Sequence, residues 1–151
     1  VPYLPYAWQE QDDKLEVESS ISKRLNVLGF MKKNNKLESY IFECTINSEI
    51  IIACIDKFSE KLEKETVLVM DNASIHQNKK LWEKQKKWEE KGLQIFFLPT
   101  YSPQLNKIEI LWRFIKYKWL EPLAYGSYLN LVKAVEDVLI NFGSKYTINF
   151  A

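Results

Sequence analysis

The chain has 151 residues, of which 46% are hydrophobic and only four are Gly, and this composition excludes collagen-like, low-complexity and disordered proteins. The 21 Lys and Arg residues nearly balance the 20 Asp and Glu residues, so a polyanion would have to be bound by a local patch of the surface. The longest apolar run, residues 50–55, is far shorter than the roughly 20 residues of a membrane span, which predicts a soluble, cytoplasmic protein without a membrane partner. The missing initial Met suggests a fragment.

The first predicted elements are two strands joined by a tight turn. Residues 24–31 alternate in polarity, and residues 37–45 are rich in aromatic and β-branched side chains. The segment between them contains Asn34 and Asn35, and Asn adopts positive φ more readily than most residues. The pattern therefore predicts an antiparallel hairpin. Cys44 and Cys54 lie in apolar stretches, which favours buried free thiols over the one possible disulfide.

A helix and a strand follow the hairpin. Ser48 could cap a helix over residues 49–65, where apolar residues recur at steps of three and four. Residues 66–70 are apolar at both parities, as in a strand buried on both faces by helices, and this strand ends at Asp71. A carboxylate is thus expected at the carboxyl end of a strand.

The rest of the chain is predicted as a helix, a strand and two further helices. In chain order these elements cover residues 79–91, 93–98, 105–120 and 128–142. Gly92 fits the position just after the first of these helices, and Pro99 stops the strand. The helix over residues 105–120 is expected to bury one apolar stripe, formed by Leu105, Ile108, Trp112, Ile115 and Trp119. Glu109 lies at the edge of this stripe and is expected to be half-buried. The element order predicts one α/β domain over residues 1–151, with a mixed sheet and helices on both faces.

Two acidic residues differ from the others in their setting. Most Asp and Glu residues lie in charged runs that are typical of solvated helix faces, whereas Asp71 and Glu109 lie next to apolar segments. Carboxylates in such settings can bind magnesium or another hard cation. Two simpler interpretations stay open: Asp71 could form an Asx turn, and Glu109 could pair with Arg113 one helical turn later.

Longer motifs surround these two acids. Residues 67–76 contain an Asp-Asn-x-x-x-His string beginning at Asp71, and residues 98–112 contain Pro-x-Tyr-Ser-Pro-x-Leu-Asn-Lys-Ile-Glu ending at Glu109. Together with residues 5–9 and 24–29, they closely resemble the catalytic core of bacterial insertion-sequence transposases of the mariner-like superfamily. Those enzymes carry an Asp-Asp-Glu triad, and the resemblance assigns its second and third members to Asp71 and Glu109.

The resemblance implies a ribonuclease-H-like fold and a metal-dependent DNA strand-cleaving and strand-transferring activity. Three carboxylates of such a site hold two magnesium or manganese ions, and Asp71 and Glu109 would be catalytic and metal-binding. Asn72, His76 and Asn106 could orient the acids or the scissile phosphate, although His76 could instead be a loop residue that hydrogen-bonds backbone. The implied partners are transposon ends and target DNA in the bacterial cytoplasm, and the active complex would contain a homodimer.

Basic side chains on two predicted helices are candidate DNA contacts, although a charged helix face is more often simply solvated. The candidates on the helix over residues 79–91 are Lys79 and Lys80, and those on the helix of Glu109 are Arg113 and Lys116.

The sequence departs from the family pattern at two places. Lys107 stands where the family has Pro, and the strand that carries the first Asp of the triad is missing before the Pro5-Tyr6-Ala7-Trp8 segment. Asp12 and Asp13 lie after that segment in a polar stretch, so they are poor substitutes. Two interpretations follow: a transposase core truncated at its N-terminus, or a catalytically inactive remnant that folds and associates with DNA or a full-length transposase. This chain alone is expected to be inactive.

The missing strand also leads to a structural expectation. In ribonuclease-H-like folds it lies between the hairpin and the strand that ends at Asp71. Pro2 and Pro5 each lack a backbone donor, so residues 1–8 cannot easily fill that place. Upstream residues or a second copy would have to fill it, or else the hairpin would close directly on residues 66–70.

Overall fold

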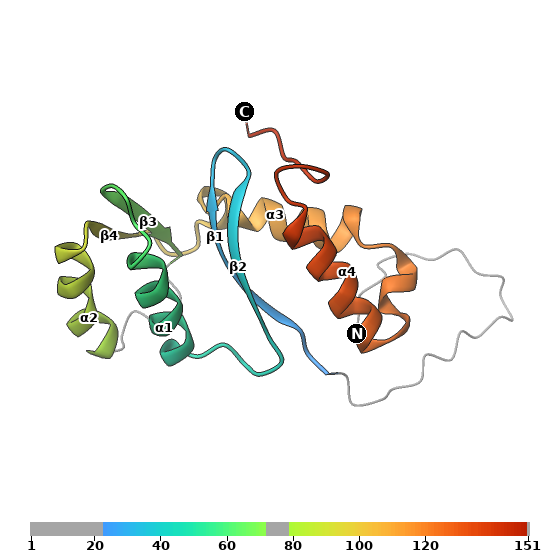
Figure 1. The fold of residues 1–151 in the computed structure, drawn as a ribbon, viewed down its shortest axis with the longest axis horizontal. Helices are drawn as coiled ribbons and strands as arrows, with labels where there is room; N and C mark the ends of the chain where they lie inside the picture. The colour runs from blue at the N-terminus through green and yellow to red at the C-terminus, as the bar shows by residue number, and fades with distance from the viewer. Residues whose placement is uncertain (1–22, 72–78, 151) are drawn as a thin grey trace, which may run out of the picture.

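The computed structural model describes residues 23–71 and 79–150. Within them a two-stranded hairpin is followed by alternating helices and strands and then by the C-terminal helices, as in a mixed α/β protein (Figure 1). The strands are β1 (Asn26–Lys32), β2 (Lys36–Phe42), β3 (Thr66–Met70) and β4 (Leu93–Phe97). The α-helices are α1 (Ser48–Ser59), α2 (Lys79–Glu90), α3 (Ile108–Phe114) and α4 (Tyr128–Ile140). Three short helical segments, η2 (Pro103–Leu105), η3 (Ile115–Trp119) and η4 (Pro122–Gly126), flank α3 and precede α4. No helix in the described ranges is long and apolar enough to cross a membrane.

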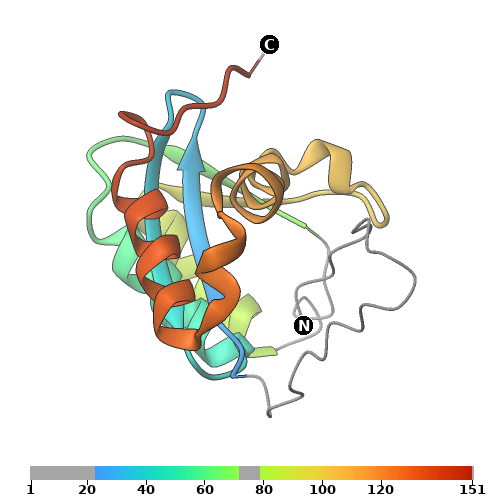
Figure 2. The ribbon, with the colours of Figure 1, turned by 90° about the vertical axis from the view of Figure 1, so that its right-hand side faces the viewer.

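The hairpin of β1 and β2 is confirmed and lies between the two groups of helices (Figure 1). Asn35 has a φ of 56° in its turn, the left-handed conformation expected of an Asn there. One face of the hairpin packs with α1 through residues such as Phe30 and Tyr40, and the other packs with α3 and α4 through residues such as Val27 and Ile41. Figure 2 shows the C-terminal helices lying over this second face. The hairpin is therefore the shared wall of two hydrophobic clusters.

Gly29 allows α3 to approach β1 closely. A Cβ atom at this position would lie 3.1 Å from the Trp112 ring and 3.2 Å from Ile108 and Leu37 side-chain carbons. These distances are tighter than ordinary van der Waals contact, so a larger residue would push α3 away from the hairpin.

Among the described residues, helices cover only one face of the parallel pair of β3 and β4. Leu68, Met70 and Ile95 pack with α1 and α2, which both lie on the same side of the pair. Val67 and Val69 point to the other side, where they are 58% and 45% exposed. The prediction that helices bury this strand on both faces is therefore wrong, because the C-terminal helices pack on the hairpin instead.

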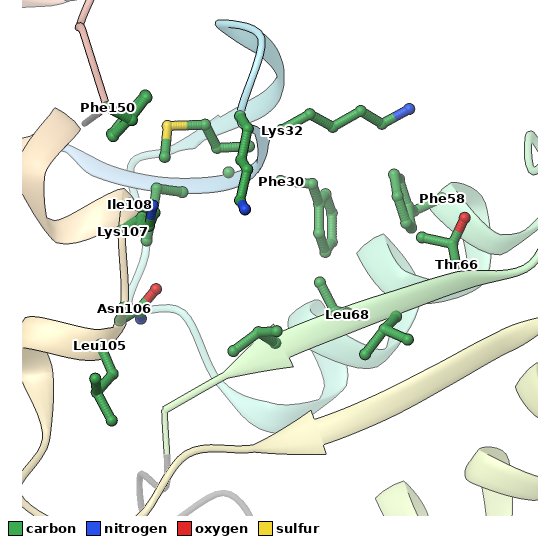
Figure 3. Close-up of a pocket in the computed structure, with 15 residues that line it drawn as sticks. Phe30, Lys32, Phe58, Thr66, Leu68, Leu105, Asn106, Lys107, Ile108 and Phe150 are labelled. Atoms are coloured by element: carbon green, nitrogen blue, oxygen red, sulfur yellow. The ribbon is translucent and has the colours of Figure 1, made fainter.

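The described strands form two separate sheets and not the single mixed sheet that was predicted. β1 pairs only with β2, and β3 pairs only with β4, so within residues 23–71 and 79–150 one edge of β1 and one edge of β3 carry no ladder. A groove of about 310 Å³ lies between these edges (Figure 3). We call it the interstrand groove; residues 29–33, 66–69 and 105–108 line it with Phe58 and Phe150. Direct closure of the hairpin on residues 66–70 is thus excluded for the described chain, and residues 1–8 lie outside it.

Helix α1 starts and ends differently from its prediction. The Asn47 side chain, not Ser48, caps it by accepting a 2.9 Å hydrogen bond from the backbone N–H of Ile50. The helix ends at Ser59, whose hydroxyl donates to the Asp56 carbonyl at 2.7 Å, instead of continuing to residue 65. The residues after Ser59 are charged except for Leu62, so further turns would bury little apolar surface.

Trp88 and Asp56 join α2 to α1. The Trp88 side chain is completely buried, and its Nε1–H donates to an Asp56 carboxylate oxygen at 2.8 Å. The Lys84 ammonium donates to the other oxygen at 2.6 Å. Burial raises the pKa of Asp56, but the two hydrogen bonds and the positive charges of Lys84 and Lys91 outweigh it, so the pKa lies below its ordinary value.

The C-terminal part departs from prediction mainly at its first helix. The predicted helix over residues 105–120 is divided into η2, α3 and the π-helical η3, and Leu105 is 52% exposed instead of belonging to the core stripe. Leu111 is the fully buried residue of α3. Asn106 has an extended ψ of 95°, which ends η2 and delays the start of α3 to Ile108.

Helix α4 and the free state of the two cysteines agree with prediction, but the exposure of Cys44 does not. Helix α4 is confirmed over Tyr128–Ile140, capped by the Ser127 hydroxyl, which accepts from the Asn130 N–H at 3.1 Å. Both cysteines are free, as predicted, and Cys54 is buried. Cys44 is exposed, however, because it follows the end of β2 and lies beyond both hydrophobic clusters.

Candidate functional site

Asp71 and Glu109 come from different elements that end in the same region. Asp71 follows the last residue of β3 directly, and Glu109 is the second residue of α3. The backbone N–H of Leu98 donates to the Met70 carbonyl at 2.8 Å, so β4 remains paired with β3 up to this point. The loop that leaves β4 therefore begins beside Asp71.

That loop turns the chain back toward the end of β3. Tyr101 adopts a φ of 57°, and Pro103 begins the short helix η2. The Asn106 carbonyl then accepts a 3.0 Å hydrogen bond from the Glu109 N–H in the first turn of α3. The turn residues Tyr101 and Pro103 thus bring the chain back to α3, and Glu109 is held in place by this backbone path together with the packing of α3 on the hairpin.

Asp71 and Glu109 line one pocket of about 200 Å³, which we call the carboxylate pocket. Asn106 lines it as well, and the remaining walls come from Pro99, Tyr101, Ser102 and Pro103. Glu109 is half-buried, as its place at the edge of the apolar stripe predicts, and Asp71 is exposed. Within residues 79–150 the ion pairs do not include one between Glu109 and Arg113, and Glu109 lines this pocket.

Of the three residues predicted to orient the acids, the structure describes one, Asn106. Asn106 lines the carboxylate pocket together with both acids, whereas Asn72 and His76 lie outside the described residues. Among the described residues no group of three or more His, Cys, Asp and Glu side chains is close enough to hold a metal ion. The carboxylate pocket therefore offers two carboxylates and one amide, all of them oxygen donors of the kind that hard divalent cations prefer.

The four basic candidates fall into two groups. On α2, Lys80 lies 2.7 Å from a Glu49 carboxylate oxygen, and Lys79 lies 4.0 Å from Glu83, so both are beside acids of the protein itself. Arg113 and Lys116 are exposed on the continuous helical segment formed by α3 and η3, which also carries Glu109. Neither member of the second group is among the described residues that line the carboxylate pocket.

Tyr101 belongs to the Pro-x-Tyr-Ser-Pro motif, but the sequence analysis did not name it as a candidate for binding DNA. Its side chain is 99% exposed at the rim of the carboxylate pocket, and its backbone is in the left-handed region, which is uncommon for a residue other than Gly, Asn or Asp. The signal in the sequence that could have pointed to this role is the aromatic residue within the motif that leads to Glu109.

The chain was also compared with known proteins. A family model described as DDE superfamily endonuclease matches residues 1–131, which is most of the chain. No curated protein and no solved structure matches it.

Proposed function

This chain belongs to the DDE superfamily endonucleases, and from that premise we propose that it is the catalytic core of a mariner-like insertion-sequence transposase. The family membership indicates nuclease or transposase-type cleavage of DNA. The observation that carries the proposal is that Asp71 and Glu109, 38 positions apart by their numbering, line one pocket together with Asn106. The proposed reaction is metal-dependent cleavage of a DNA strand followed by its transfer to target DNA.

The proposed cofactors are two magnesium or manganese ions, and Asp71 and Glu109 would be their ligands. Both side chains are hard oxygen donors, and neither free thiol lies in the carboxylate pocket. When bound, such ions activate the attacking hydroxyl and stabilise the leaving oxygen of a phosphodiester. The protein's own part is to hold its carboxylates in place. For Glu109 this is done by the packing of α3 on the hairpin together with the loop over residues 99–107.

The DNA would be positioned by residues around the carboxylate pocket. Arg113 and Lys116 follow Glu109 along the same helical segment and would contact backbone phosphates, while Asn106 would orient an acid or the scissile phosphate. Lys79 and Lys80 are the weaker candidates, since they lie next to acidic residues. Asn72 and His76 remain proposed orienting groups, and transposon ends, target DNA and a second copy of the protein remain the proposed partners.

Metal binding is the first test of this site. We expect manganese to bind weakly to the chain, and we expect the Asp71→Ala, Glu109→Ala double variant to lose that binding, because two carboxylates hold a divalent ion only loosely and their removal leaves one amide. Isothermal titration calorimetry or manganese relaxation measures the affinity. Glu136→Ala, which removes an exposed acid on α4, is the matched control. Equal affinities of the wild-type chain and the double variant would reject the assignment.

Tyr101 extends the proposal to the way the DNA is held. A fully exposed aromatic ring at the rim of the carboxylate pocket can stack on a nucleobase beside the scissile phosphate, an interaction worth about 1–3 kcal/mol per base. We therefore expect Tyr101→Ala to weaken binding of single-stranded DNA by roughly tenfold or more, measured by fluorescence of a 2-aminopurine oligonucleotide. Tyr101→Phe keeps the ring and should bind as the wild type does. If Tyr101→Ala binds with unchanged affinity, the ring does not contact DNA.

A further inference from the structure

The first turn of α3 carries Glu109 and has little support from its own residues. α3 has only seven residues, and among the described residues no side chain caps its start at Lys107. The Glu109 N–H donates to the Asn106 carbonyl at 3.0 Å, and the Ile110 N–H donates to the Lys107 carbonyl at 3.1 Å. Helix ends fray first, and an uncapped end frays most readily. Contacts from elsewhere in the chain must therefore keep this turn formed.

Phe150 makes such a contact, although it is distant from α3 in the sequence. Its ring centroid lies 5.7 Å from the Lys107 Nζ atom. It lines the interstrand groove beside Lys107 and Ile108, and Figure 3 shows it next to these two residues. Phe150 also packs with the hydrophobic cluster that contains the buried Leu111. Since Gly29 lets β1 approach Ile108 as well, the start of α3 is held by β1 and by Phe150.

The hairpin turn determines where Phe150 lies. We call residues 143–150 the return segment, because they lead from α4 past the hairpin turn to the start of α3. The Asn35 Oδ1 atom accepts from the Ile148 N–H at 2.8 Å, and the Asn35 Nδ2 atom donates to the Ile148 carbonyl at 3.1 Å. These two bonds fix the backbone two positions before Phe150. Ile148 itself is 5% exposed, so apolar packing anchors the same point.

The other end of the return segment also contacts the hairpin turn. Gly143 has a φ of 91°, and a Cβ atom at this position would lie 2.4 Å from the Asn35 carbonyl oxygen. Only a residue without a side chain fits so closely against the backbone of the turn. Asn35 is thus in contact with both Gly143 and Ile148, and it holds the return segment at two points.

We propose that Asn35 and Phe150 are positioning residues for Glu109. Asn35 holds the return segment, and Phe150 at the end of that segment keeps the first turn of α3 formed, so that Glu109 lines the carboxylate pocket. This inference rests on the proposed function, since it takes Glu109 as a metal ligand. It adds that the ligand is held in place by residues that themselves lie outside the carboxylate pocket.

Amide hydrogen exchange of the whole chain, resolved by nuclear magnetic resonance, tests the first step. Asn35→Gly removes both hydrogen bonds to Ile148 without straining the turn, because Gly adopts positive φ freely. Phe150→Ala removes the ring. In each variant the amides of Glu109 and Ile110 should exchange at least tenfold faster, while those of α2, which packs in the other hydrophobic cluster, keep their rates.

Manganese affinity tests the second step. Only molecules with a formed first turn can offer Glu109 to the metal, so Asn35→Gly and Phe150→Ala should weaken manganese binding about threefold or more, toward the affinity of Glu109→Ala. Asn34→Gly changes an exposed residue of the same turn and is the matched control. Phe150→Tyr keeps the ring, and both of these proteins should bind manganese and exchange amides as the wild type does.

A second substitution can replace the contact that Phe150 provides. Lys107 has a φ of −61°, which suits Pro, and the preceding Asn106 is extended, as a residue before Pro should be. Pro at position 107 would fix the entry into α3 locally. Adding Lys107→Pro to Phe150→Ala should therefore restore most of the lost protection and of the lost manganese affinity. A lack of restoration would overturn the proposal, because Phe150 would then act elsewhere than at the start of α3.

Other outcomes also decide the matter. Unchanged exchange at Glu109 in both Asn35→Gly and Phe150→Ala, or equal acceleration in α2, would overturn the proposal. So would faster exchange with unchanged manganese affinity, if Glu109→Ala lowers that affinity. The proposed function fails in a different way: Glu109→Ala would then bind manganese as the wild type does, and the exchange rates would still show whether the return segment holds Glu109 in place.

Discussion

Replacing either Asp71 or Glu109 by Ala should lower DNA cleavage by about three orders of magnitude or more in the active protein that contains this core. In phosphoryl transfer most of the catalysis is positioning and charge stabilisation, and each of the two carboxylates would take part in holding the metal charge. Asp71→Asn and Glu109→Gln keep the size of the side chains and remove their charge, so they should be nearly as inactive. Cleavage of a labelled transposon-end duplex in the presence of magnesium measures the effect.

The matched control for this experiment is Glu136→Gln, because Glu136 is an exposed acid on α4 that does not line the carboxylate pocket. It should cleave at the wild-type rate. Thermal unfolding of all variants shows whether a lost activity reflects a lost fold. Either Asp71→Ala or Glu109→Ala retaining cleavage would remove that residue from the site, and cleavage retained in both would refute the proposed reaction centre.

The largest effect on stability is expected at Trp88. Its side chain is completely buried between α1 and α2, so Trp88→Ala leaves a large cavity and should lower the free energy of unfolding by about 3–5 kcal/mol. Urea denaturation followed by circular dichroism measures the change. Trp82→Ala on the same helix is the control, since Trp82 is 56% exposed and its loss creates no buried cavity. Similar losses in the two variants would show that the buried position of Trp88 is not what stabilises α2.

Trp88→Phe separates the hydrogen bond from the packing. It keeps an aromatic ring but removes the Nε1–H that donates to Asp56, and should cost about 1–3 kcal/mol at neutral pH. In the wild type the pKa of Asp56 is lowered on folding, so its contribution is present above the unfolded-state pKa of about 4 and is lost as the pH falls through the lower folded-state value. The difference between the two proteins should therefore shrink below about pH 4. A difference independent of pH would show that packing alone explains the loss.

Local sequence patterns determined the elements of this protein where neighbouring residues supply the reason. Asn35 in the hairpin turn, the apolar run of residues 66–70 and the short apolar run of β4 each have a cause within a few positions, and the structure has these elements where they were predicted. The placement of Glu109 at the edge of an apolar stripe is of the same kind, since helical periodicity alone makes that position half-buried.

The tertiary structure decided which surfaces cover one another. The apolar pattern of β3 is the same whether one face or both are covered, and only the packing of α3 and α4 on the hairpin leaves Val67 and Val69 exposed. The separation of the two sheets is likewise invisible in the composition of β1 and β3, because strand pairing depends on residues distant in the chain.

The same distinction holds at the carboxylate pocket. The sequence identified Asp71 and Glu109 through their apolar surroundings and through the motifs that contain them, but it could not show that they line one pocket. That meeting depends on the backbone path between β4 and α3, with the left-handed Tyr101 and the extended Asn106. Several loop conformations are compatible with the same residues, and the one adopted is selected by where β4 and α3 are held by the rest of the fold.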